Sequence, residues 1–302
     1  MKESMIRMYH LLHGTTGTSP VFHIEADLID KKINFVPSLY EITELIGGLT
    51  SHLLEPLKRK FPRLRDLFSF PGNNSKDLHE TLTEDHNFHK LQEKLNDEVL
   101  YCTQHIQQYL KSWESFADIW EVNRDMFITR YEKLNPTVAS FDADIGRYTE
   151  VANNVKMQET VTTVHFLDIN SDRLKAAIIK DCSLWQQKLT GLLLRITQMT
   201  LDGLYQYIAE NSDKVEKEPR NLTEMQVMLC LLDRLKTEIH LKEEEFPKLQ
   251  EQYQTLVKYE IPMTLEFKRK LQGLKIYWGQ YLTLLSTSEV TIEENKVQCP
   301  FS

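Results

Sequence analysis

The residues whose types and spacing come closest to a chemical site are His79, Asp85, His86 and His89. His86 and His89 are three residues apart, so they would share one face of a helix, and imidazole with carboxylate is a common ligand set for zinc. The acidic residues among them also suit the first turn of a helix, where negative charge meets the positive end of the helix dipole. We therefore interpret this segment as the polar start of a long helix and predict no bound metal.

Known catalytic motifs are missing from the sequence. No glycine precedes a lysine, so there is no P-loop, and the glycine-rich dinucleotide, nucleophile-elbow and zinc-protease patterns do not occur. Cys182 lies three residues before Trp185 in an apolar stripe and is interpreted as a core cysteine. The acidic run at 242–245 is interpreted as a solvated helix face, with a docking patch for a basic partner as the alternative. We predict no enzyme, no catalytic residues and no cofactor.

Composition excludes several further classes. Of 302 residues, 41% are hydrophobic and 26% charged, which is typical of a folded protein, and only 10 glycines and 10 prolines favour long helices over an all-β fold. The net charge of -8 gives no overall attraction to nucleic acid. No run of about 18 apolar residues could span a membrane. The four widely spaced cysteines and the lack of a signal peptide predict an intracellular chain with reduced thiols, namely Cys102, Cys182, Cys230 and Cys299.

A β-hairpin is predicted at 21–36, after a polar break. Apolar residues alternate with polar ones there with a period of two, first Phe22, Ile24, Ala26 and Leu28, then Ile33 and Phe35 before Pro37. This is the only strand pattern that we accept. Since an isolated hairpin is marginal in water, we expect it to lie against a helix and not to form an independent sheet.

From Ser38 onwards the apolar period changes to that of helices. Ser38 is placed to cap a helix that runs to about Pro62, and Asn135-Pro136 ends a short helix. Long helices are predicted at 78–120, 141–164, 174–208, 222–256 and 264–285, with Pro247 kinking or splitting the fourth. The tail at 286–302 is expected to fray. All four tryptophans fall on helical stripes and are predicted to be core residues, namely Trp113, Trp120, Trp185 and Trp278.

The clearest linker lies at 61–75, where prolines and a Gly-Asn-Asn run cannot continue a helix. We predict three parts: 1–72 with the hairpin and one helix, 73–217 with a long-helix bundle, and 218–302 with further helices and a frayed tail. The predicted fold class is all-α, with long helices in elongated antiparallel or spectrin-like bundles and one small β-hairpin near the N-terminus.

The C-terminal part contains three ordered motifs. A P-R-x-L element opens a helix at Pro219 to Leu222. An L-x-x-x-Y-x-x-L-x-x-Y motif follows, with Tyr253, Leu256 and Tyr259, and then a helix that carries Trp278. In order and spacing, this region strongly resembles the end of the tail of dynein heavy chains, at the approach to the linker.

The resemblance extends upstream and covers nearly all of residues 20–285. The hairpin and the start of the next helix are similar to the family pattern F-x-x-x-A-x-L-x-D followed by I-x-F-x-P-S-L. Phe22 is its first residue, and Pro37 and Leu39 belong to its last three. Trp113 with Phe116, and the segment from Phe166 to Trp185, match in order as well. Each motif is weak alone, but the combination is specific, and it is more similar to axonemal chains than to cytoplasmic ones.

The resemblance implies a structural role. Dynein heavy chains are microtubule motors of cilia whose ATPase ring lies far C-terminal of this region, so we expect no motor activity in this chain, only indirect microtubule association, and a place in the cytoskeleton of the axoneme. The implied partners are other dynein chains: intermediate, light or light-intermediate chains, or another heavy chain. No nucleic acid or membrane partner is expected. After about Leu285 the pattern departs from the family, so we expect either a part of a larger heavy chain or a tail-only protein.

Two alternatives remain open from the residues. One is an unrelated spectrin-like or tethering helical adaptor, which would have no need of the Phe22 to Pro37 hairpin. The other is a helical regulator of a small GTPase, for which the sequence offers no identifiable arginine or asparagine.

Overall fold

The computed structural model describes residues 2–15, 17, 20–60 and 84–298. The chain forms two compact units. The N-terminal unit comprises 1–123 and 149–183, and the C-terminal unit comprises 124–148 and 184–302. The linker predicted at 61–75 lies outside the described residues, and the division of the sequence after residues 72 and 217 stays a prediction.

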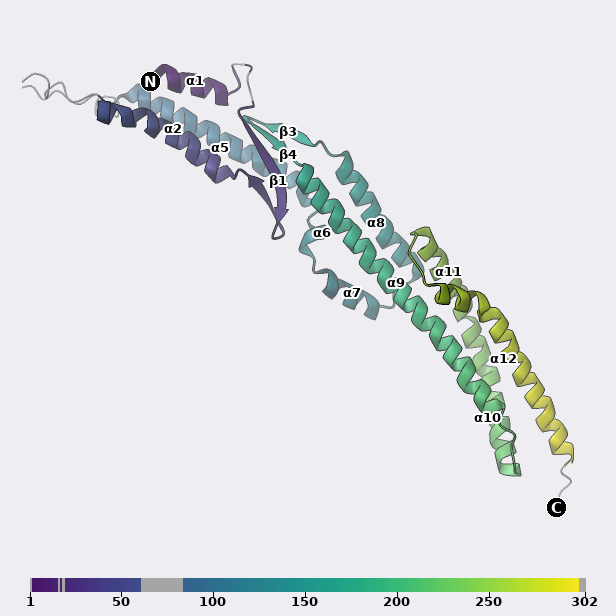
Figure 1. Ribbon diagram of the computed structural model, residues 1–302. Coiled ribbons are helices and arrows are strands. Elements are labelled where there is room, and N and C mark those ends of the chain that lie inside the picture. Colours follow the sequence, from purple (N-terminus) through teal and green to yellow (C-terminus); the bar gives the residue numbers. More distant parts are fainter. Residues whose placement is uncertain (1, 16, 18–19, 61–83, 299–302) are drawn as a thin grey trace, which may run out of the picture. The chain divides into compact units, whose positions relative to one another are not determined.

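The N-terminal unit combines helices with a β-sheet (Figure 1). Its helices are α1, α2, α5 and α6, and it also takes in the end of α8 and the start of α9. The elements in chain order are α1 (Lys2–Leu12), β1 (Phe22–Ile29), β2 (Lys32–Val36), α2 (Leu39–Lys60), α5 (His86–Glu114), α6 (Asp118–Glu121), α8 (Val138–Met157), β3 (Val161–Val164), β4 (Leu167–Asn170) and α9 (Asp172–Val215).

The sheet has four strands in the order β2-β1-β4-β3. β1 pairs antiparallel with β2 and parallel with β4, and β3 pairs antiparallel with β4. The prediction of an all-α fold with a single hairpin was therefore wrong in this respect, although the long helices are confirmed. The missed strands are only four residues each, too short for alternation to stand out, and Val161 had been assigned to a helix that in fact ends at Met157.

The hairpin itself is confirmed. Ile24 and Ala26 point into the core, and the turn between the strands consists of Asp30 and Lys31, both with positive φ, 50° and 62°. Two residues in the left-handed region form the turn type whose twist matches that of antiparallel strands. The hairpin belongs to the larger sheet because Phe22 to Glu25 also pair with β4.

Local capping explains where the helices begin. Ser38 and Glu41 form a capping box: the Glu41 backbone N–H donates to Ser38 Oγ at 3.2 Å, and the Ser38 backbone N–H donates to Glu41 Oε2 at 2.8 Å. Asp85 caps α5 by accepting a hydrogen bond from the Asn87 backbone N–H at 2.8 Å. These contacts confirm Ser38 as a cap and place the start of α5 at His86.

The helix predicted over 78–120 is wrong in its extent. α5 ends at Glu114, and the backbone N–H groups of Phe116 and Ala117 then donate to carbonyls three residues earlier before α6 begins. This tighter turn separates the two helices while Trp113 and Trp120 both stay buried.

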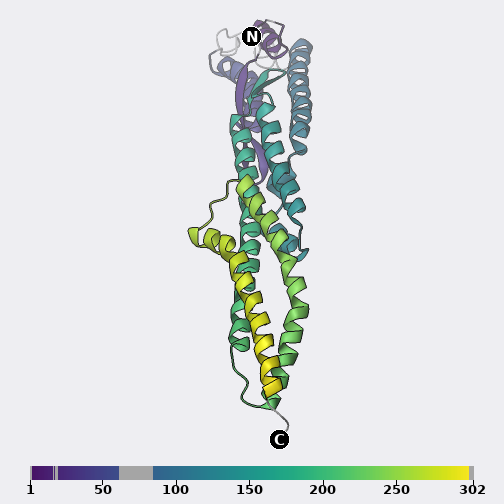
Figure 2. The ribbon, with the colours of Figure 1, turned by 90° about the vertical axis from the view of Figure 1, so that its right-hand side faces the viewer.

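In the C-terminal unit, every secondary-structure element of the part that the structure describes is a helix, and short turns and loops join the helices. It contains α7 (Arg124–Lys133), the start of α8, most of α9, and then α10 (Leu222–Glu243), α11 (Glu245–Lys258) and α12 (Leu265–Gln298). Figure 2 shows α10 and α12 side by side. Their core joins α9, α10 and α12 through buried residues such as Leu204, Leu232 and Trp278.

Two helix ends in this unit differ from the predictions. The helix predicted over 222–256 is split at Glu244, three residues before Pro247. Pro247 thereby falls in the first turn of α11, where a proline is tolerated because the N–H that it lacks would have no partner within the helix. α12 does not end near Leu285 but continues to Gln298, so the prediction of a frayed tail at 286–298 was wrong. Ile292, seven residues after Leu285, is buried and continues the apolar stripe past a run of small polar residues.

Candidate functional site

The predicted metal-like cluster does not form a site among the described residues. His79 lies outside them, and Asp85 accepts the hydrogen bond that caps α5. Within residues 2–15, 17, 20–60 and 84–298, no group of three or more His, Cys, Asp or Glu side chains is arranged to hold a metal ion. None of the described helices is both long and apolar enough to cross a membrane.

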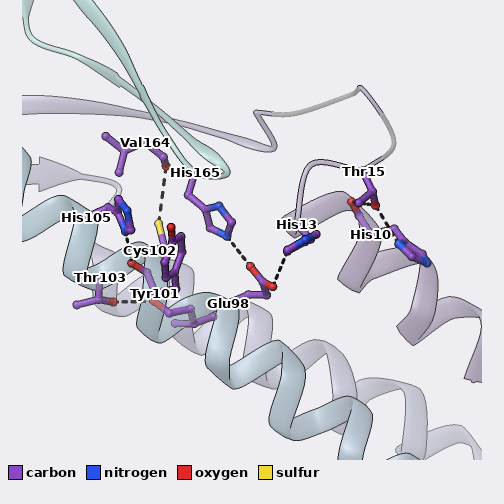
Figure 3. A network of polar contacts seen from close by, with 11 residues as sticks. His10, His13, Thr15, Glu98, Tyr101, Cys102, Thr103, His105, Val164 and His165 are labelled. Atoms are coloured by element: carbon purple, nitrogen blue, oxygen red, sulfur yellow. Dashed lines mark hydrogen bonds and ion pairs between the residues drawn. The ribbon is translucent and has the colours of Figure 1, made fainter.

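A polar cluster in the N-terminal unit gathers around Glu98 of α5 (Figure 3). His13, in the turn after α1, lies 2.7 Å from Glu98 Oε1 through Nδ1, and His165, between β3 and β4, lies 2.6 Å from Oε2 through Nε2. The carboxylate is only 12% exposed, so it uses both oxygens where water has little access. His165 has a φ of 57° and its ring meets the edge of the Tyr101 ring. The cluster fastens the end of α1 and the β3–β4 turn to α5.

Cys102 lies one turn further along α5 and is not a reactive thiol. Its Sγ is 3.8 Å from the carbonyl oxygen of Val164, and its side chain is buried. Burial raises the pKa of the Cys102 thiol to about 12, so the nucleophilic thiolate does not form near neutral pH. Cys182 is buried, as predicted.

The motif residues of the N-terminal unit pack and shape its fold. The Phe22 ring lies 6.1 Å from that of Phe166, which precedes β4, and Trp113 is buried with its ring 6.1 Å from that of Phe116. Pro37 is exposed between β2 and α2, and Leu39 is the half-buried first residue of α2. These residues pack against neighbouring elements, and Phe22 also lines a hollow of about 450 Å³ together with residues of α1 and α2 such as Leu12 and Ile46.

Trp185 is the centre of an aromatic cluster in the C-terminal unit. It is 1% exposed, its ring stacks on that of Tyr148 at 5.3 Å, and it meets the Phe127 ring edge-on at 5.2 Å. The Arg124 guanidinium lies over its ring at 5.9 Å. The cluster thereby joins α7, α8 and α9. All four tryptophans are buried, which confirms the prediction that they are core residues.

Tyr259, the last residue of the predicted tyrosine motif, fastens the end of α11 to α8. Its hydroxyl donates to Asp142 Oδ1 at 2.7 Å and lies 3.1 Å from the Asp142 carbonyl oxygen. Lys258 Nζ donates to the same carboxylate at 2.6 and 2.8 Å. These bonds, the one from Lys258 foremost, hold the pKa of Asp142 below its ordinary value, whereas burial and the neighbouring carboxylate raise the pKa of Tyr259.

The other motif residues cap or pack helices. Pro219 is half-buried, and Leu222 is a 73% exposed first residue of α10, whose start is capped by Asn221 accepting from the Glu224 backbone N–H at 2.8 Å. Leu256 is fully buried and Tyr253 is half-buried.

The acidic run at 242–245 is not a uniformly solvated face. Trp278 Nε1 donates to Glu243 Oε1 at 3.1 Å, and Glu244 ends α10. The interpretation as a solvated face was therefore wrong for Glu243, because its carboxylate accepts from a buried tryptophan. The interpretation of the run as a docking patch stays untested.

Sequence analysis missed the Glu98 cluster and the Asp142 contacts. His13 and Glu98 are 85 residues apart, and Tyr259 and Asp142 are 117 apart. The spacing of residues along the sequence cannot predict hydrogen-bonded pairs at such separations. The burial of Leu256 and Trp278 could be predicted, because their apolar neighbours recur at helical spacing.

Fold and site together define a helical protein in which the motif residues pack, cap and fasten helices, with a mixed sheet in one unit. Residues 187–300 match the family described as dynein axonemal heavy chain 2/5/8 coiled-coil. The chain is 32% identical to mouse dynein axonemal heavy chain 2 over 289 residues, which are 94% of this chain and 6% of that relative. It is 27% identical to the Chlamydomonas reinhardtii dynein-1-beta heavy chain of the flagellar inner arm I1 complex over 313 residues, 98% of this chain and 7% of that one.

The chain therefore belongs to the axonemal dynein heavy-chain family, and it spans only a small part of the length of these relatives. Membership confirms the resemblance and removes the alternative of an unrelated adaptor. The family match extends to residue 300, so the predicted departure from the family after about Leu285 was wrong.

Proposed function

We propose that this chain is a structural segment of a dynein heavy-chain tail, on the approach to the linker, which positions the motor and binds other dynein chains in the axoneme. The chain itself performs no ATP hydrolysis and associates with microtubules only through the assembled dynein. Intermediate, light and light-intermediate chains, or another heavy chain, are the expected partners.

The observation that supports this proposal is that most of the family-motif residues pack helices together or cap them. Trp185, Leu256 and Trp278 are buried, and Tyr259 joins α11 to α8, so the motif residues build stiff, laterally packed helices. Long packed helices transmit force along their axes and leave their outer faces available for partners. The match to a family described as a coiled coil supports the same role.

The test uses the tagged full chain in ciliated cells. We expect intermediate or light chains of an axonemal dynein to co-purify with it, and we expect the purified chain alone neither to hydrolyse ATP nor to sediment with microtubules. Met199→Ala, at an exposed position of α9, serves as the matched control for Trp185→Ala on the same helix. The first variant should retain the partners, and the second should lose them because the C-terminal unit is destabilised. Recovery of no dynein chain by the unmodified protein, or ATP hydrolysis by it, contradicts the proposal.

A further inference from the structure

A groove runs between α9 and α12 in the C-terminal unit. It consists of two adjacent hollows of about 420 and 540 Å³ that share Glu216 and Leu284 in their lining. We call it the α9–α12 groove. Its lining is mixed: Tyr277 and Leu284 are half-buried apolar residues, Ser288 and Thr291 are polar, and the buried core residues Ile208, Tyr281 and Ile292 lie beneath. The helices that border it can be followed in Figure 2, where α9 is green and α12 is yellow.

The groove opens where side chains between the two helices become small. At its start, the rings of Tyr205 and Tyr277 stack at 5.0 Å, and the Tyr205 hydroxyl donates to the Lys270 carbonyl oxygen at 2.8 Å. Beyond this point α9 presents Ser212, and α12 presents residues such as Ser288, which are too short to fill the space. The helices thus lie close together at this end, and beyond it the groove runs beside the core to which Val215 and Leu285 belong.

The shape of the groove fits a helix. Its lining on α12 extends from Tyr277 to Ile292, about 22 Å at 1.5 Å per residue, which is the length of a helix of about four turns. Along α12 the lining residues recur at intervals of three and four, as do those that receive a helix packed alongside. A helix satisfies its own backbone hydrogen bonds, so it can lie in a groove of mixed lining without leaving backbone groups unpaired.

The charged residues that line the groove indicate which kind of partner helix would bind there. Among the described residues that line the groove, Asp213, Glu216 and Glu218 are acidic and Lys217 is basic, and all four are exposed. The acidic residues belong to α9 and the segment after it, so the negative charge lies along one edge. A second copy of this chain would bring the same acidic edge and a net charge of -8, which opposes self-association there.

We propose that the α9–α12 groove binds an amphipathic helix of a partner protein, with its apolar stripe against Tyr277 and Leu284 and a row of Lys or Arg beside Asp213 and Glu216. The proposal deepens the proposed function, and it depends on that function only in taking the partner to be a dynein subunit. The binding itself depends on the residues of the C-terminal unit alone.

The test measures fluorescence anisotropy of two labelled synthetic peptides against the full chain. Both peptides are helical, about four turns long, and carry the same leucine stripe, but one has lysines along one edge and the other has glutamates. We expect the lysine peptide to bind at least about tenfold more tightly, because several surface charge contacts that are individually weak add up along the edge. Equal affinity of the two peptides, or binding of neither, overturns the proposal.

Two variants separate the groove from the charge of the whole chain. Asp213→Lys with Glu216→Lys should reverse the preference between the peptides. Asp233→Lys with Glu251→Lys changes the net charge equally at exposed positions of α10 and α11 and should leave the preference unchanged. If both pairs change it alike, the preference arises from overall charge and the groove is not the site.

A further variant tests the groove itself. Ser212→Trp fills the groove and should weaken binding of the lysine peptide about tenfold or more, with the helical circular dichroism signal unchanged. If sedimentation shows instead that the chain self-associates and that Ser212→Trp abolishes this, the occupant is a second copy and the proposal fails. If neither peptide binds the unmodified chain while dynein subunits still co-purify with it, the groove is rejected and the proposed function stands.

Discussion

Replacement of Trp185 by alanine should destabilise the C-terminal unit by about 3–5 kcal/mol, the usual cost of removing a buried tryptophan. The structure places this residue at the upper end of that range, because it is 1% exposed and its ring contacts two others, Tyr148 and Phe127. Such ring pairs contribute about 0.5–1.5 kcal/mol each beyond the burial of surface. A domain is stabilised by only about 5–15 kcal/mol, so the loss would be a large fraction of the whole.

The assay is urea unfolding of the full chain followed by circular dichroism, with hydrogen exchange and mass spectrometry to localise the change. Peptides from α7, the start of α8 and the later part of α9 should exchange much faster in Trp185→Ala. Met199→Ala is the control on the same helix, since Met199 is 66% exposed and its loss should change stability by no more than about 0.5 kcal/mol. A cost below about 1 kcal/mol for Trp185→Ala, or equal costs for the two variants, would refute the reasoning that this cluster fastens α7, α8 and α9 together.

Three further outcomes follow from the described contacts. Tyr259→Phe should lower the local stability of α11, measured by hydrogen exchange, by about 1–2 kcal/mol, because the hydrogen bond from a half-buried hydroxyl to a carboxylate is lost. Lys258→Met breaks an exposed ion pair and should lower it by less than about 1 kcal/mol. The pKa of Asp142 is lowered in the folded state, so its ionised form stabilises the fold above its ordinary pKa; the stability difference from Asp142→Asn should persist from pH 5 to 7 and close as the pH falls below about 4. At neutral pH, iodoacetamide should alkylate Cys230, which is exposed, and spare Cys102, which is buried with a raised pKa; mass spectrometry of the peptides distinguishes the two.

The periodicity of apolar residues predicted most of the helices and the hairpin, because both are determined by neighbours in the sequence. It failed for β3 and β4, where the pairing of Phe22 with Leu167 in the parallel ladder joins residues that no local pattern connects. It also failed for the end of α12, where the polar run after Leu285 resembled a loop. There, Thr287 donates its hydroxyl to the Thr283 carbonyl oxygen, so the polar side chains are accommodated on the helix surface.

The site was predictable to the extent that it lies in buried stripes. Each motif tryptophan was placed correctly in the core, since aromatic residues at helical spacing are usually packed. The polar contacts that join elements within each unit could not be predicted from the sequence. Glu98 has ordinary helical neighbours in the sequence, and only the folded chain brings His13 and His165 to its two oxygens.

The burial of the motif residues determines how mutations in this chain are to be interpreted. Trp185 and Trp278 make the family recognisable, yet neither is exposed to a partner, so a loss of binding on their replacement reports a loss of folding. Asp213 in α9 and Glu216 directly after it are exposed, and within the part of the chain that the structure describes neither side chain forms an ion pair or a hydrogen bond, so their replacement can change binding without changing the fold. The charge reversal at Asp213 and Glu216 therefore tests the proposed recognition separately from stability.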